Sequence, residues 1–139
     1  MDYFLSGEAA DTTPFDRDTV AALVGHSAGW VIEGDPSPLD TEKNAIEPRY
    51  ALVHYGTNDM GLGSTYASAS RPFYDHMTQL VDGLSAEGIV SILIGISPRG
   101  DRPSADRWVR SYNAIIRGIA QSRGLPFVDL FHATAEIPG

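Results

Sequence analysis

Short, continuously apolar runs alternate along this chain with longer segments whose apolar residues recur at helical spacing. Runs without polar alternation are typical of strands that are buried on both faces of a parallel sheet. The four runs span residues 20–24, 50–55, 89–96 and 127–130. Strands that alternate with helices predict an α/β fold in which helices cover a parallel sheet. In such folds the chemistry lies just beyond the carboxyl ends of the strands.

Two strong amphipathic helices and one weaker helix are expected between the strands. The first strong helix has Ser70 as its expected N-cap and Gly88 as its stop signal. The second covers residues 108–119 and ends at Gly124, and the weaker helix covers residues 39–46. The apolar faces of the strong helices consist of Phe73, Met77, Leu80, Val81 and Leu84, and of Trp108, Tyr112, Ile115, Ile116 and Ile119.

Charge and composition exclude several classes of protein. The 139 residues include 10 Lys and Arg against 18 Asp and Glu, a net charge of −8, so no nucleic-acid partner is expected. The longest apolar run, residues 92–96, is far too short for a membrane span. Residues 1–5 show no secretory signal pattern, which leaves the compartment unassigned. One domain is expected from the length.

No metal or cofactor is expected either. Cysteine is absent, which excludes disulfides and thiolate metal sites, and the four histidines lack the spacing of zinc ligands. Neither the G-x-G-x-x-G nor the G-x-x-x-x-G-K-[ST] phosphate-binding pattern occurs, so nucleotide cofactors are not expected.

Residues 25–29 read Gly-His-Ser-Ala-Gly, a formal match to the G-x-S-x-G turn that carries the nucleophile of α/β-hydrolases. That turn needs a helix that starts at the serine, because the helix N-terminus stabilises developing negative charge. Gly34 and two prolines follow closely, so no stable helix is expected after Ser27. The pattern favours a plain glycine-rich turn, with an α/β-hydrolase that uses Ser27 as an alternative.

A second glycine-containing loop, Gly-Thr-Asn-Asp at residues 56–59, follows the apolar run 50–55. Gly56 allows a sharp turn, which aims the carboxamide of Asn58 across the edge of the sheet, where it could donate to an oxyanion. Taken alone, an Asx-type turn that ends the strand is the better interpretation.

Together these segments resemble the SGNH, or GDSL-type, serine hydrolases. Residues 56–59 resemble the third sequence block of that family, and residues 91–99, 112–116 and 125–130 resemble its next strand and loop, the following helix and the last core strand. The resemblance covers roughly residues 15 to 139. It implies a three-layer α/β/α sandwich around a flavodoxin-like parallel sheet. It also implies hydrolysis of a small-molecule ester, either a small acyl ester or an acetylated sugar.

The resemblance also implies roles for individual residues. Asn58 becomes the side-chain donor of the oxyanion hole, and Gly29 the backbone donor, with Gly25 as the alternative glycine. Asp59 becomes a residue that orders the loop. The family places its nucleophile in a Gly-Asp-Ser block, which this chain lacks. Its general base lies in an Asp-x-x-His block beyond the last strand. Asp129 and His132 fit those letters but sit on the strand end itself, before the usual position of that block, so they stand with Ser27 as fallback catalytic residues.

The missing block predicts a single SGNH-like domain, residues 1–139, that is incomplete at both ends. In the flavodoxin-like order the first strand is central, and without it the edges of two apolar strands lack backbone partners. We therefore expect a missing segment, or self-association of the chain, to cover those edges. The alternative to an esterase is a truncated or non-catalytic relative that only binds a ligand.

Overall fold

The computed structural model describes residues 18–135 and confirms an α/β fold with a parallel sheet. The strands lie in the order β1-β2-β3, and both neighbouring pairs are parallel. Tyr50 lies beside Val90 in the first pair, and Leu93 beside Phe127 in the second. Each strand is shorter than the apolar run that predicted it. The strands are β1 (Tyr50–Val53), β2 (Val90–Ile94) and β3 (Phe127–Val128).

The expected strand at residues 20–24 is not formed, which corrects one prediction. These residues are irregular, and Leu23 and Val24 are exposed. Side chains occupy the backbone groups that a strand ladder would need: the N–H of Val20 donates to the Glu42 carboxylate, and the carbonyl of Ala21 accepts the hydroxyl of Tyr55. Residues 20–24 are therefore held by the side chains of Glu42 and Tyr55 and add no strand to the sheet.

The three expected helices follow the apolar periodicity, but both strong helices begin earlier than expected, the second at Pro103 and not at residue 108. The first strong helix begins at Tyr66 and not after Ser70, because Thr65 and Ser68 form a capping box earlier in the chain. Ser70, the expected N-cap, lies inside the helix and is buried. The weaker helix is confirmed, with Ser37 as its cap. The helices are α2 (Ala28–Ile32), α3 (Pro38–Ile46), the 3-10 turn η1 (Asp59–Gly61), α4 (Tyr66–Ala86), α5 (Pro103–Ser122) and α6 (Leu130–Ala135).

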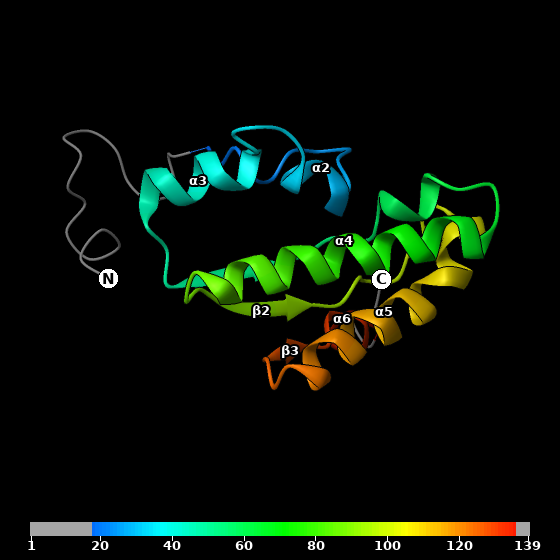
Figure 1. The fold of residues 1–139 in the computed structure, drawn as a ribbon. Coiled ribbons are helices and arrows are strands. Elements are labelled where there is room, and N and C mark those ends of the chain that lie inside the picture. Colours follow the sequence, from blue (N-terminus) through cyan, green and yellow to red (C-terminus); the bar gives the residue numbers. More distant parts are fainter. Residues whose placement is uncertain (1–17, 136–139) are drawn as a thin grey trace.

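The core lies between the sheet and the pair α4 and α5, which pack against each other and against β2 (Figure 1). α2 and α3 lie beside α4, on the other side from α5 (Figure 1). The largest fully buried side chains come mainly from α4, α5 and β2. They include Phe73, Met77 and Leu84 of α4, Leu93 of β2, and Tyr112 and Ile116 of α5. None of the helices formed by residues 18–135 is long and apolar enough to cross a membrane.

The opposite face of the sheet carries apolar side chains that remain accessible. Successive residues of a strand point to opposite faces, and the buried Val53 and Leu93 alternate with residues that are exposed or partly exposed. Leu52 is 72% exposed and Tyr50 66% exposed. Val90 and Val128 continue this exposed apolar face across the sheet. A second helical layer of a sandwich would pack here.

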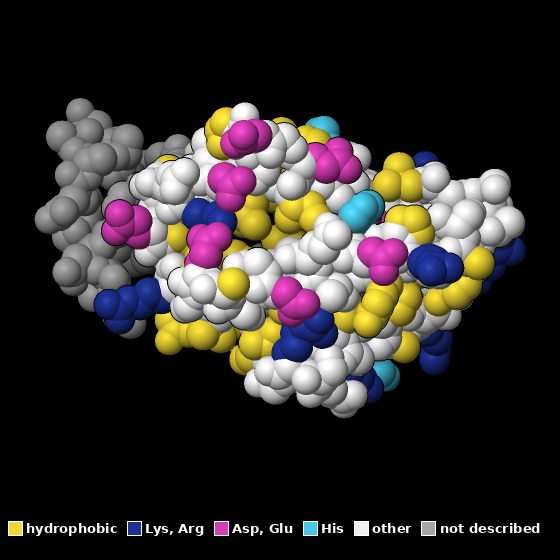
Figure 2. All heavy atoms as spheres, viewed as in Figure 1, with side chains coloured by type: hydrophobic (Ala, Val, Ile, Leu, Met, Phe, Trp, Pro, Cys, Tyr) yellow, Lys and Arg dark blue, Asp and Glu magenta, His cyan; other side chains and the backbone are white. Residues whose placement is uncertain are grey.

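β1 is an edge strand over the described part of the chain. An apolar groove of about 250 Å³ runs along it, between α3 and α4. Figure 2 shows a hollow between these helices with hydrophobic side chains on its floor. The groove is lined mainly by Leu39, Ile46, Leu52, Val53, Leu80 and Leu84.

Candidate functional site

The loop after β1 turns at Gly56, as its spacing predicts. Gly56 has a φ of +120°, a conformation that side chains with a Cβ rarely adopt. A Cβ atom at this position would lie 2.6 Å from Cδ1 of Ile96 and 3.1 Å from Cζ of Phe73. The backbone therefore approaches the core so closely that only glycine fits. This approach fixes the start of the loop that carries Asn58 and Asp59.

The side chain of Asn58 is exposed and held in one orientation. Its Nδ2 donates a hydrogen bond to the backbone carbonyl of His26, with a distance of 2.8 Å between nitrogen and oxygen. A carboxamide nitrogen carries two hydrogens. One is used in this bond, so the other remains for a ligand. Asn58 therefore has the donor that an oxyanion hole requires, positioned beside the segment 26–29.

Asp59 joins the two glycine-containing segments below the surface. It is 2% exposed, and its carboxylate accepts the backbone N–H of Ala28 at 3.1 Å and that of Gly56 at 3.1 Å. Burial raises the pKa of this carboxyl. The hydrogen bonds and the nearby His76 lower it, but the effect of burial is larger. The contacts fit a residue that orders the loop, because both of these N–H groups depend on the carboxylate.

A helix does follow Ser27, which corrects the expectation that Gly34 and the prolines leave no room for one. α2 begins at Ala28, and Oγ of Ser27 accepts the N–H of Trp30 at 3.4 Å as its N-cap. The five residues of α2 fit before Gly34. Its first N–H is satisfied by Asp59, from a segment 31 residues away. Local sequence could not reveal that acceptor.

Gly29 is the second residue of α2 and is buried against α4. A Cβ atom here would lie 2.7 Å from the ring of His76, so α2 packs closely onto α4 at this glycine. Backbone N–H groups in the first turn of a helix have no acceptor within the helix. Ala28 and Trp30 find theirs in Asp59 and Ser27, whereas residues 18–135 provide none for Gly29.

The structure thus brings the segments of Gly29 and Asn58 together. The hydrogen bonds from Asn58 to His26 and from Ala28 to Asp59 connect them directly. That both donors face one ligand remains a prediction. The alternative glycine, Gly25, is exposed in a turn with a φ of +88°.

A pocket of about 350 Å³ opens beside Asn58. It lies between the loop after β1, the loop after β2 and the first turns of α5. The guanidinium of Arg99 forms two hydrogen bonds with Asp101, of 2.8 and 2.9 Å. The sequence pattern assigned Trp108 only to the apolar face of a helix and gave no sign that Arg107 lines a pocket. The pocket is lined by Thr57, Asn58, Arg99, Arg102, Arg107 and Trp108, among others.

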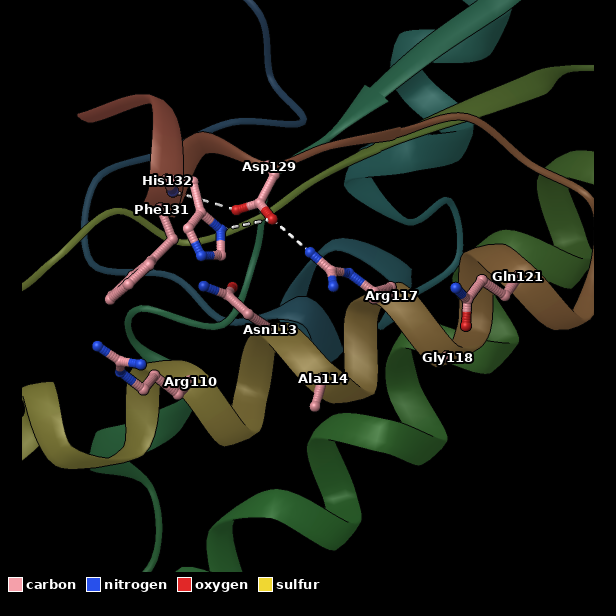
Figure 3. Close-up of a pocket in the computed structure, with 9 residues that line it drawn as sticks. All are labelled: Arg110, Asn113, Ala114, Arg117, Gly118, Gln121, Asp129, Phe131 and His132. Atoms are coloured by element: carbon pink, nitrogen blue, oxygen red, sulfur yellow. Dashed lines mark hydrogen bonds and ion pairs between the residues drawn. The ribbon is translucent and has the colours of Figure 1, made fainter. Parts of the chain in front are cut away.

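Asp129 and His132 form a close pair in a different pocket (Figure 3). Nδ1 of His132 lies 2.8 Å from Oδ2 of Asp129, and the N–H of His132 donates to Oδ1 at 3.2 Å. Arg117 contacts the same carboxylate. Burial opposes ionisation of Asp129, but the hydrogen bonds from His132, with the charges of His132 and Arg117, outweigh it and lower its pKa. β3 ends at Val128, so the pair marks the start of α6 and is not part of the strand.

The fallback catalytic residues are not gathered at one place. The pocket of Asp129 and His132 measures about 280 Å³ and lies along residues 110–121 of α5 and the start of α6. Neither Ser27 nor Asn58 lines it. Among residues 18–135, no group of three or more His, Asp and Glu side chains could hold a metal ion.

Comparisons with known proteins agree on one family. A family model described as the GDSL-like lipase/acylhydrolase family matches residues 6–139. No curated protein sequence matches the chain. The fold is similar to the crystal structure of a GDSL-like lipase from Bacteroides thetaiotaomicron, with a TM-score of 0.60 and 19% sequence identity. That match covers 83% of this chain and 56% of the other, so the chain spans little more than half of that protein's length.

Proposed function

Because the chain belongs to the GDSL-like lipase/acylhydrolase family, a family of hydrolases, we propose that it is the oxyanion-binding part of a serine ester hydrolase. The substrate is a small acyl ester or an acetylated sugar. The observation that carries this proposal is the 2.8 Å hydrogen bond from Asn58 to the carbonyl of His26, which orients the carboxamide beside the first turn of α2.

The proposed chemistry is nucleophilic acyl transfer. A serine hydroxyl attacks the ester carbonyl carbon and passes its proton to a histidine, and the carbonyl electrons move onto the oxygen. The second hydrogen of Asn58 Nδ2 and the N–H of Gly29 donate to this oxyanion. The alcohol then leaves with the proton from the histidine, and water hydrolyses the acyl-enzyme. Donors that are fixed in advance stabilise the transition state because they need no reorganisation when charge develops.

The test is hydrolysis of p-nitrophenyl acetate by the chain extended on both sides in its reading frame. Removing one oxyanion donor lowers kcat by about 10²–10³, so Asn58→Ala should lose that much activity with a smaller change in KM. Asn58→Asp should lose at least as much, because a carboxylate cannot donate and repels the oxyanion. The matched control is Asn44→Ala, at an exposed position of α3.

Full activity in both Asn58 variants would contradict the oxyanion assignment. An extended protein that binds ester substrates but turns none over would favour the alternative, a non-catalytic relative that only binds a ligand. Circular dichroism separates either result from loss of folding.

A second candidate is an α/β-hydrolase that uses Ser27, and one observation favours it: α2 begins directly after this serine. Against it, residues 20–24 form no strand before the turn, and no histidine of residues 18–135 is hydrogen-bonded to Oγ. We therefore expect a fluorophosphonate probe to leave Ser27 unlabelled. Labelling that disappears in Ser27→Ala, but persists in Ser64→Ala as control, would make Ser27 the nucleophile.

A further inference from the structure

Arginine side chains are concentrated on the wall of the pocket beside Asn58. The whole chain has 10 Lys and Arg residues and a net charge of −8. Three of those ten, Arg99, Arg102 and Arg107, line this one pocket, and no Asp or Glu is among the described residues that line it. A pocket lined by arginines and by no carboxylate favours an anionic ligand, even on a protein whose net charge is negative.

The three arginines are not equivalent. Arg99 is neutralised by its two hydrogen bonds to Asp101, so it shapes the loop and adds little net charge to the pocket. Arg102 and Arg107 form no ion pair with any carboxylate among residues 18–135. The guanidinium carbon of Arg107 lies 5.3 Å from the ring centre of Trp108, a cation–π contact that restrains this side chain. Two guanidinium groups are therefore available to a ligand.

We propose that this pocket binds an anionic group, a carboxylate or a phosphate, carried by the ester that the protein hydrolyses. Guanidinium groups match the geometry of both anions, with two parallel N–H donors each. The pocket also contains Asn58, so an anion on Arg102 and Arg107 leaves the ester carbonyl within the same cavity as the proposed oxyanion donor. The assignment of this anion to an ester substrate rests on the proposed function, whereas the binding of an anion does not.

The experiment measures binding without turnover. The indole N–H signals of the two tryptophans are followed by NMR while the chain is titrated, at constant ionic strength, with succinate, methyl phosphate or the neutral succinamide. Trp108 lines the pocket and reports binding, and Trp30 in α2 serves as internal reference. We expect saturable shifts of Trp108 with the anions and none with succinamide. The anion that binds more tightly identifies the group as carboxylate or phosphate.

Substitutions then locate the site. Arg102→Gln and Arg107→Gln should each weaken anion binding about tenfold, the usual loss for one charge-assisted hydrogen bond. Arg71→Gln, at an exposed position of α4, makes the same charge change elsewhere and should leave binding unaltered. Equal weakening by Arg71→Gln, shifts with succinamide, or no saturable shift with either anion would overturn the proposal.

This outcome is separate from that of the hydrolysis assay. If the protein binds the anions but has no esterase activity, the proposal that the pocket binds an anion stands and the proposed ester hydrolase function is rejected. In an active protein, a preference for p-nitrophenyl hemisuccinate over p-nitrophenyl butyrate that Arg102→Gln abolishes would assign the anion to the substrate. An active protein without that preference would reject the substrate assignment alone.

Discussion

Single residues connect the two segments of the candidate site, and some of their contacts are local in the sequence whereas others join residues far apart along the chain. The turn at Gly56 is local in origin, and a glycine two residues before an asparagine at a strand end predicts it. The roles of Gly29 and Asp59 depend on partners far along the chain, namely His76 for the glycine and Ala28 for the carboxylate. The resemblance of the sequence to the family marks both residues as part of the candidate site. It does not show that Asp59 provides the first acceptor for α2.

Gly29 gives the first prediction. A methyl group at this position meets the His76 ring at 2.7 Å, so Gly29→Ala must displace that ring or α2 itself. We expect a loss of about 1–3 kcal/mol in the free energy of unfolding, as for other additions to a packed interior. Urea denaturation measures it. Gly83→Ala is the control, since a Cβ there meets nothing within 4 Å in the interior of α4, and it should stabilise by about 0.5–1 kcal/mol. Equal stability changes in both variants would contradict the packing argument.

At the scale of whole elements, α3, α4 and α5 were predictable, whereas α2, α6 and the lack of a strand at residues 20–24 were not. An amphipathic helix such as α4 or α5 makes its hydrogen bonds within itself, so apolar spacing and caps suffice to indicate it. A strand needs a partner elsewhere in the chain. Residues 20–24 have the composition of a strand, yet their backbone groups are taken by Glu42 and Tyr55. The apolar run 127–130 indicates a strand that includes Asp129 and gives no sign of α6, although Asp129 accepts the N–H of His132 as a helix cap does.

The N-terminus of α3 gives a prediction on pH. Hydrogen bonds from Ser37, with a further contribution from Lys43, lower the pKa of Asp40 from 3.8 to about 2. A carboxyl whose pKa is lower in the folded state stabilises the fold above its unfolded pKa, and that contribution is lost as the pH falls towards 2. The amides in the first turn of α3 should therefore lose protection between pH 4 and pH 2, when their exchange rates are compared with the intrinsic rates at each pH. Because the side chain is 46% exposed, the effect should be small.

Asp40→Asn tests this assignment. The variant keeps an oxygen that can cap the helix but has no group that titrates in this range, so its first turn should exchange with no additional acid dependence. Asp75→Asn, at an exposed position of α4, serves as the control. An unchanged acid dependence in Asp40→Asn would assign the effect to another carboxylate.

At the scale of the whole molecule, the described residues leave one edge and one apolar face of the sheet uncovered. β1 has no outer neighbour among the described residues, and Leu52 and Tyr50 lie exposed on the uncovered face. We expect the isolated chain to self-associate, since an apolar edge strand offers unpaired backbone groups to a second chain. Light scattering coupled to size exclusion should show species larger than 15.0 kDa. Leu52→Lys should shift them towards the monomer, and Leu62→Lys, exposed in the loop after η1, should not. A monomeric parent chain would contradict this expectation.

Residues 1–139 alone should show no appreciable esterase activity, even with both of the proposed oxyanion donors present. A nucleophile and its base act as a unit, and loss of either one lowers the rate by several powers of ten. The Gly-Asp-Ser triplet is absent, and Ser27 and His132 lie at separate places in the fold. Oxyanion donors alone leave an effect of order 10³ over water, which p-nitrophenyl acetate hydrolysis would hardly register. The measurement compares residues 1–139 with the same segment extended on both sides. Clear turnover by the shorter chain, abolished by Asn58→Ala, would place a nucleophile and a base within these residues, and Ser27 and His132 would be the first to substitute.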